Sequence, residues 1–153
     1  EVNPRINSSN LVISGNAMHT CGFDSCTIGF NCRAAIVVGI QAGSGTDGVL
    51  ITNNLIWNMS SGCVWDRNGS TFGPMEIYHN TCYDYGKGTG GAGDPNPEGI
   101  AGFSDGGHAT IKNNIIYAPN GTDPLDASAF TASNNACGAG KSCGSNSIVF
   151  TAP

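Results

Sequence analysis

Apolar and polar residues alternate over short stretches of this chain, and the alternation stops each time at a pair of turn-forming residues. Five segments share the pattern apolar–x–(Asn, His or Gly)–Asn–x–apolar, as in residues 51–56 (ITNNLI). Alternation with a period of two is typical of a half-buried β-strand. Asparagine tolerates the left-handed backbone region, so each pair predicts a turn between two short strands. The second residue of the pair is Asn16, Asn54, Asn80, Asn114 or Asn135.

A third apolar stretch lies between most of the repeats. These stretches are Ala35–Ile40, Gly62–Trp65, Gly99–Phe103 and Ser147–Phe150. A constant core pattern joined by loops of variable length predicts strands that wind repeatedly and stack on one another. We therefore predict an all-β fold: a parallel β-helix solenoid of about five coils, with three short strands per coil and coils about 4.8 Å apart.

Stacking would place the second asparagine of each repeat above its counterpart in the next coil. We expect these five residues to form an internal ladder, because an unpaired buried amide costs about 1–3 kcal/mol. The alternative is that the Asn-Asn pairs are only surface turns. His79 stands where other repeats have Asn53 and Asn113, and we interpret it as a substitute in the turn rather than as a catalytic base.

The amino-acid composition and net charge argue against some kinds of protein and ligand. Of 153 residues, 11% are charged and 39% are hydrophobic, and the net charge is −5. This balance argues against a disordered chain and against a nucleic-acid ligand. No apolar run approaches the length of a membrane span. We expect residues 1–153 to form a single β-helix domain that is part of a longer protein.

Seven cysteines in so short a chain predict an oxidising compartment, and therefore a secreted or cell-surface location. We expect Cys137 to pair with Cys143, and two of Cys21, Cys26 and Cys32 to pair with each other. The spacings do not match a zinc site. In a eukaryotic host, four N-x-S/T sequons would be candidate glycosylation sites. They begin at Asn7, Asn58, Asn68 and Asn120.

The repeat resembles the pectate-lyase-like superfamily of right-handed parallel β-helix proteins. The resemblance is clearest in residues 49–56 (VLITNNLI) with 62–64 (GCV), and in residues 107–116 (GHATIKNNII). It implies a right-handed coil but no particular activity, since lyases, hydrolases, epimerases, tailspikes and adhesins share such coils. The family usually caps its first coil, and we recognise no cap here. An open β edge would favour self-association through the coil ends.

Loops on a rigid solenoid are the expected place for a functional site, and the resemblance puts substrate grooves along one sheet beside such loops. The weak catalytic candidates are Asp66, Arg67, Asp105 and His108, and the candidate substrate contacts are Trp65, Tyr83, Tyr85 and Glu98. Each has a plainer interpretation. Asp66 and Arg67 could be a surface ion pair, His108 could lie in a solvated turn, and Trp65 could belong to the core.

The chemistry of these candidates is incomplete. Asp66 and Asp105 on neighbouring coils could meet the separation of about 5–9.5 Å that glycoside hydrolysis requires. The central candidates for the base of a lyase are Arg67, Lys87 and Lys112, of which we expect Lys112 to point outward as a solubilising residue. However, the sequence has neither the paired aspartates with Gly-His-Gly of polygalacturonases nor the Arg-x-Pro-x-x-Arg of pectate lyases. Asp84, Asp94 and Glu98 could bind calcium, although their Pro/Gly-rich context favours a solvated loop.

Two functions follow from these observations. The first is a secreted domain that recognises or processes polysaccharide, with the question of enzymatic activity left open. The second is a structural role as a stalk, an adhesin or a filament subunit that assembles through its coil ends.

Overall fold

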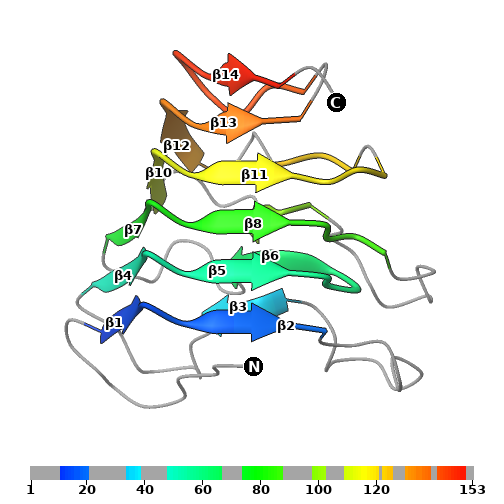
Figure 1. The fold of residues 1–153 in the computed structure, drawn as a ribbon. Coiled ribbons are helices and arrows are strands. Elements are labelled where there is room, and N and C mark those ends of the chain that lie inside the picture. Colours follow the sequence, from blue (N-terminus) through cyan, green and yellow to red (C-terminus); the bar gives the residue numbers. More distant parts are fainter. Residues whose placement is uncertain are drawn as a thin grey trace.

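The fold is all-β over the part of the chain that the computed structural model describes. That part comprises residues 11–20, 34–38, 48–66, 74–87, 98–102, 109–120, 122–125, 130–138 and 141–150. Within these ranges the chain forms fourteen strands and no helix. The strands make three parallel sheets, which the chain visits in turn so that successive rungs stack (Figure 1). This arrangement is consistent with a parallel β-solenoid.

Each sheet takes one strand from each of several successive coils. The five-stranded sheet contains β1 (Leu11–Ser14), β4 (Val49–Thr52), β7 (Met75–Tyr78), β10 (Ala109–Lys112) and β12 (Phe130–Ser133). The six-stranded sheet contains β2 (Ala17–His19), β5 (Leu55–Trp57), β8 (Thr81–Tyr83), β11 (Ile115–Tyr117), β13 (Ala136–Cys137) and β14 (Ile148–Val149). The three-stranded sheet contains β3 (Ala34–Val38), β6 (Gly62–Asp66) and β9 (Ile100–Gly102).

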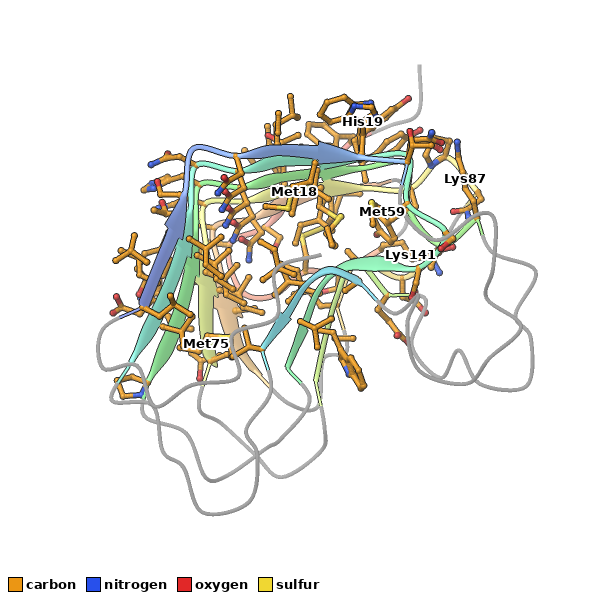
Figure 2. The ribbon with its side chains drawn as sticks, turned by 90° about the horizontal axis from the view of Figure 1, so that it is seen from below. Met18, His19, Met59, Met75, Lys87 and Lys141 are labelled. Carbon is orange, nitrogen blue, oxygen red and sulfur yellow. A yellow bond between two sulfur atoms is a disulfide. The ribbon has the colours of Figure 1, made fainter. Side chains whose placement is uncertain are left out.

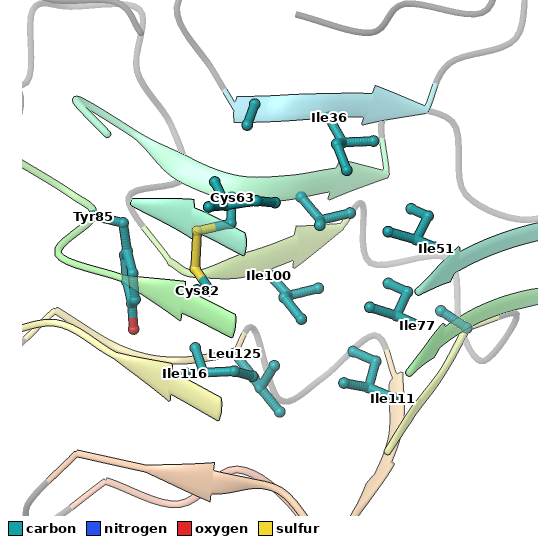
Figure 3. Packing of buried hydrophobic residues seen from close by; sticks show 14 of the residues in the cluster. Ile36, Ile51, Cys63, Ile77, Cys82, Tyr85, Ile100, Ile111, Ile116 and Leu125 are labelled. Carbon is teal, nitrogen blue, oxygen red and sulfur yellow. A yellow bond between two sulfur atoms is a disulfide. The ribbon is translucent and has the colours of Figure 1, made fainter. Parts of the chain in front are cut away.

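The hydrophobic core fills the space that the three sheets enclose. Equivalent residues of successive coils lie in register, so that Ile51 of β4 pairs with Ile13 of β1 and with Ile77 of β7. Ile77 in turn pairs with Ile111 of β10, and Figure 3 shows Ile51, Ile77 and Ile111 facing the aliphatic side chains of the other sheets. Full burial of each such side chain contributes about 1.5–3 kcal/mol. Viewed along the stack, Met18 and Met75 lie inside the three walls (Figure 2).

The third sheet is shorter than the sequence pattern predicts. Three of the four predicted stretches correspond to β3, β6 and β9, and a single parallel bridge from Leu125 to Ile100 continues this sheet in the next coil. The fourth prediction is wrong, because Ile148 and Val149 pair with β13 in the six-stranded sheet. The Cys137–Cys143 disulfide closes the chain between these strands, and Ser145 already bridges back to Ser133.

The predicted asparagine ladder is present. The side-chain amide of Asn16 donates to Oδ1 of Asn54 at 3.0 Å, and Asn54 donates to Asn80 at 2.9 Å. Asn80 donates to Asn114 at 3.0 Å, and Asn114 to Asn135 at 3.1 Å. All except Asn16 are buried. The second asparagine of each pair is therefore a structural ladder residue and not merely part of a surface turn.

The residue before each ladder asparagine makes the turn. Asn53, His79, Asn113 and Asn134 all have left-handed backbone torsions, with φ between 56° and 57°, and all four are exposed. Gly15 occupies the same position in the first coil with φ of 70°. The interpretation of His79 as a turn substitute fits this column, and its Nε2 lies 3.3 Å from Nδ2 of Asn113.

Candidate functional site

Two of the three aromatic residues predicted to contact substrate are buried. Tyr85 is fully enclosed by the core, and its hydroxyl donates to the backbone oxygen of Asp123 at 3.2 Å. Trp65 of β6 is only 3% exposed and packs with Val37 and Ala101. This burial favours the core interpretation of Trp65, and substrate contact by either ring stays a prediction.

The structure describes only one of the four predicted catalytic residues, and only its backbone. Arg67, Asp105 and His108 lie outside the described residues. Asp66 ends β6, where its backbone is opposite Val38 and Gly102. The catalytic role of all four residues stays a prediction.

The acidic residues considered for calcium are described in part. Asp84 forms an ion pair with Lys87, which also donates to Oδ1 of Asn58 at 2.9 Å. Glu98 is half-buried just before β9, and Asp94 lies outside the described residues. Among the residues that the structure describes, no group of three or more His, Cys, Asp or Glu side chains could hold a metal ion.

Two disulfides lie within the described chain. The predicted Cys137–Cys143 bond is confirmed. A second bond, Cys63–Cys82, joins β6 to β8 across the interior beside Tyr85 (Figure 3). This pair was not predicted from the sequence. The pairing predicted among Cys21, Cys26 and Cys32 lies outside the described residues.

Two of the four sequon asparagines are described, and both amide nitrogens are engaged. Nδ2 of Asn120 donates to the backbone oxygens of Tyr85 and Gly86, at 3.2 and 2.9 Å. Nδ2 of Asn58 donates to Oγ1 of Thr20 at 3.0 Å. Asn7 and Asn68 lie outside the described residues, and glycosylation at the four sites stays a prediction.

The buried phenol of Tyr85 predicts a loss of stability in alkali. Burial, and secondarily the negative charges of Asp123 and Glu98, raise the pKa of Tyr85 above its ordinary value of 10.0. In the unfolded chain the phenol ionises above pH ~10, whereas in the fold it stays protonated to a higher pH. The unfolded state is therefore favoured increasingly as the pH rises above about 10, and the free energy of unfolding falls. We expect the free energy of unfolding of Tyr85→Phe, measured by urea titration at several pH values, to fall less steeply above pH ~10 than that of the wild type.

Tyr83→Phe, which changes an exposed ring, is the matched control for this measurement. It should follow the wild-type curve through the same pH range. Parallel curves for Tyr85→Phe and the wild type would contradict the assignment.

An apolar surface covers the outer face of the six-stranded sheet. The burial of its strands alternates, so that Ile56 and Ile116 face the core while Leu55 and Ile115 face outward. Figure 2 shows the same alternation in β2, with Met18 inside and His19 outside. We call the outward positions the outer strip. The outer strip consists of Ala17, Leu55, Thr81, Ile115, Ala136 and Ile148 in one column, and His19, Trp57, Tyr83, Tyr117, Gly138 and Phe150 in the other.

The second column is a row of aromatic rings. His19 and Trp57 stack with centroids 4.5 Å apart, and Tyr83 and Tyr117 stack with centroids 5.8 Å apart. Tyr117 also meets the ring of Phe150 edge-on at 6.4 Å. Gly138 lies between these last two rungs, where a Cβ would come within 2.9 Å of the Tyr117 ring. Glycine at this position leaves room for the contact between Tyr117 and Phe150.

The outer strip is unusually exposed for part of a parallel sheet. Leu55, Tyr83 and Ile115 are 44–46% exposed, and Ile148 is 68% exposed. Parallel sheets normally have both faces covered, and contiguous exposed apolar patches commonly mark binding surfaces. Of the residues predicted to bind substrate, Tyr83 alone lies in this strip. The other residues of the outer strip were not predicted. The sequence does carry a signal for its aromatic column, because Trp57, Tyr83 and Tyr117 each stand at the third position after a ladder asparagine.

Polar groups border the outer strip on both sides. On one side lies the exposed turn column of Asn53, His79, Asn113 and Asn134. On the other side, Thr20, Asn58 and Asp84 follow β2, β5 and β8, all three with φ between 54° and 57°. Lys87 neutralises Asp84 at this second border.

The chain matches no protein-family model, no curated protein and no solved structure.

Within the described ranges, no helix has the length and apolar character needed to cross a membrane. The two described disulfides are compatible with an extracellular protein.

Proposed function

We propose that this chain is a secreted, right-handed parallel β-helix domain, similar to the pectate-lyase-like superfamily, that recognises polysaccharide. The single observation that carries the proposal is the outer strip, a column of exposed and half-buried rings beside a mostly aliphatic column in which Leu55, Ile115 and Ile148 are exposed. We place the recognition surface on this strip because Trp65 and Tyr85 are buried. The proposal is for binding rather than for catalysis.

Handedness and location are parts of the same proposal. Crossovers between parallel strands of one sheet are right-handed in about 98% of cases, which supports a right-handed coil. Disulfides persist mainly in oxidising compartments, so Cys63–Cys82 and Cys137–Cys143 support secretion.

The dimensions and chemistry of the outer strip suit an extended sugar polymer. Six strands at about 4.8 Å spacing give a surface roughly 24 Å long. The rings of the two stacked pairs lie 20° and 15° from parallel, with their centroids 4.5 and 5.8 Å apart. A sugar chain offers both C–H and hydroxyl groups. The former can contact Leu55 and Ile115, and the latter can bond with tyrosine hydroxyls.

Depletion of the protein from solution by insoluble polysaccharides tests the proposal. We expect the wild-type chain to be depleted by at least one of cellulose, chitin, a mixed-linkage β-glucan and cross-linked polygalacturonate. The double variant Leu55→Ser/Tyr83→Ser removes two exposed apolar side chains and should bind about tenfold or more weakly. Because both side chains are half-exposed, its thermal unfolding should stay close to that of the wild type.

Val12→Ser is the matched control for this variant. Val12 is 57% exposed and lies on β1, in the five-stranded sheet, so its loss should leave depletion unchanged. Equal weakening by Val12→Ser, or depletion by none of the four polymers, would contradict recognition by the outer strip.

The second candidate is a structural subunit that assembles through its coil ends. The specific observation in its favour is β14, an edge strand of the six-stranded sheet with Ile148 and Val149 exposed by 68% and 47%. Sedimentation velocity over a range of concentrations tests it. Concentration-dependent assembly that Val149→Lys abolishes would favour this role, and a monomer at every concentration would exclude it.

A further inference from the structure

We infer that the outer strip selects an uncharged polysaccharide, and that the exposed turn residues beside it bind the hydroxyl groups of this ligand. The inference rests on the proposed function. It adds the class of polymer and a second set of binding residues, which are Asn53, His79, Asn113 and Asn134.

The charge distribution carries the first half of the inference. None of the twelve positions of the outer strip is occupied by Lys, Arg, Asp or Glu. Of the described cations, Lys87 and Lys141 are paired with Asp84 and Asp123. The third, Lys112, lies on β10 of the five-stranded sheet, outside the strip. An anionic polymer is normally bound by charge-assisted hydrogen bonds from arginine or lysine, and the outer strip offers none.

The turn column carries the second half. Its residues recur once per coil at the corner where the five-stranded sheet passes into the six-stranded sheet, and they therefore repeat at about 4.8 Å along the edge of the strip. An asparagine amide offers two donors and one acceptor oxygen without charge, which matches a hydroxyl group that both donates and accepts. The ladder amides of the next residue in each pair, such as Asn54 and Asn114, bond inside the fold. Within the turn column, the exposed Asn113 amide lies 3.3 Å from Nε2 of His79.

The two halves together define the ligand. A chain lying along the stack would contact aliphatic and aromatic side chains with its C–H groups, and the turn amides with hydroxyls at one border. Uronate polymers carry a charge on every sugar, and the twelve positions of the outer strip offer them no cation in a protein of net charge −5. The geometry therefore favours a neutral glycan over polygalacturonate.

The depletion assay tests the polymer class when it is run at two salt concentrations. We expect neutral polymers to deplete the full chain equally in low salt and at about 1 M salt, where the Debye length is about 3 Å. Polygalacturonate should not deplete it in either condition. Depletion by polygalacturonate that salt abolishes would overturn the inference while supporting the proposed function. Depletion by no polymer would overturn both.

Glycine substitutions test the role of the turn column. Asn113→Gly/Asn134→Gly removes two amides and keeps the left-handed backbone, which Gly15 already adopts at the equivalent position. We expect depletion by the neutral polymer to weaken about tenfold, as for the loss of two hydrogen bonds, with thermal unfolding little changed. Thr131→Ala, on β12 of the five-stranded sheet, is the matched control. Wild-type affinity in the glycine variant would overturn the role of the amides.

Discussion

Replacing Asn114 with alanine is expected to lower the free energy of unfolding by about 3–5 kcal/mol. Its side chain donates to the backbone oxygen of Ile77 and to Oδ1 of Asn135, and it accepts from the backbone and side-chain nitrogens of Asn80. Alanine leaves these buried groups without their partner, and each unsatisfied group costs about 1–3 kcal/mol. For a domain whose total stability is about 5–15 kcal/mol, the loss is severe. Urea denaturation measures it.

The neighbouring Asn113 provides the control for this experiment. It is exposed and has φ of 57°, a conformation that glycine adopts without strain. Asn113→Gly should change the free energy of unfolding by less than about 1 kcal/mol. If Asn114→Ala were no more destabilising than Asn113→Gly, the ladder would not be a major source of stability.

The ladder could be predicted from the sequence because its cause is local and repeated. Each Asn-Asn pair lies between apolar residues that must face inward, so the position of the second asparagine relative to the core is the same in every coil. Asn54, Asn80, Asn114 and Asn135 are accordingly buried in one column. The left-handed torsion of Asn53 and Asn113 follows from the same pattern.

The predictions that failed depend on how far the chain travels between repeats. Ser147–Phe150 was expected in the third sheet because it is apolar, but the chain has already returned beside β12 at Ser145, which bridges to Ser133, so this stretch enters the six-stranded sheet. Tyr85 follows the turn after β8, where the alternation of the strand no longer indicates which way a side chain faces. The core encloses it.

The outer strip forms because equivalent residues of successive coils are aligned by the pairing of their strands. Taken singly, Leu55 or Ile115 is an ordinary exposed apolar residue that needs no explanation. The loops between repeats differ in length, so the alignment of Trp57, Tyr83 and Tyr117 emerges only when each is counted from its own ladder asparagine. A functional surface of a solenoid can therefore be predicted from sequence if the internal ladder is used as the origin of the count.

Removing the Cys63–Cys82 disulfide is expected to lower the free energy of unfolding by about 3 kcal/mol. The bond joins β6 to β8 and closes a loop with a sequence separation of 19. In the chain-entropy account, a disulfide stabilises the fold by restricting the unfolded chain, and the effect grows with the length of the closed loop. Urea denaturation of Cys63→Ala/Cys82→Ala under non-reducing conditions measures the loss.

The second disulfide is the matched control, because its cysteines are buried to the same degree but are separated by only 6 positions. Cys137→Ala/Cys143→Ala removes the same atoms from the core, so the two variants differ mainly in the loop that is released. We expect it to cost about 1 kcal/mol less than Cys63→Ala/Cys82→Ala. Equal losses, or a larger loss for Cys137→Ala/Cys143→Ala, would mean that local packing rather than loop closure sets the contribution of these bonds.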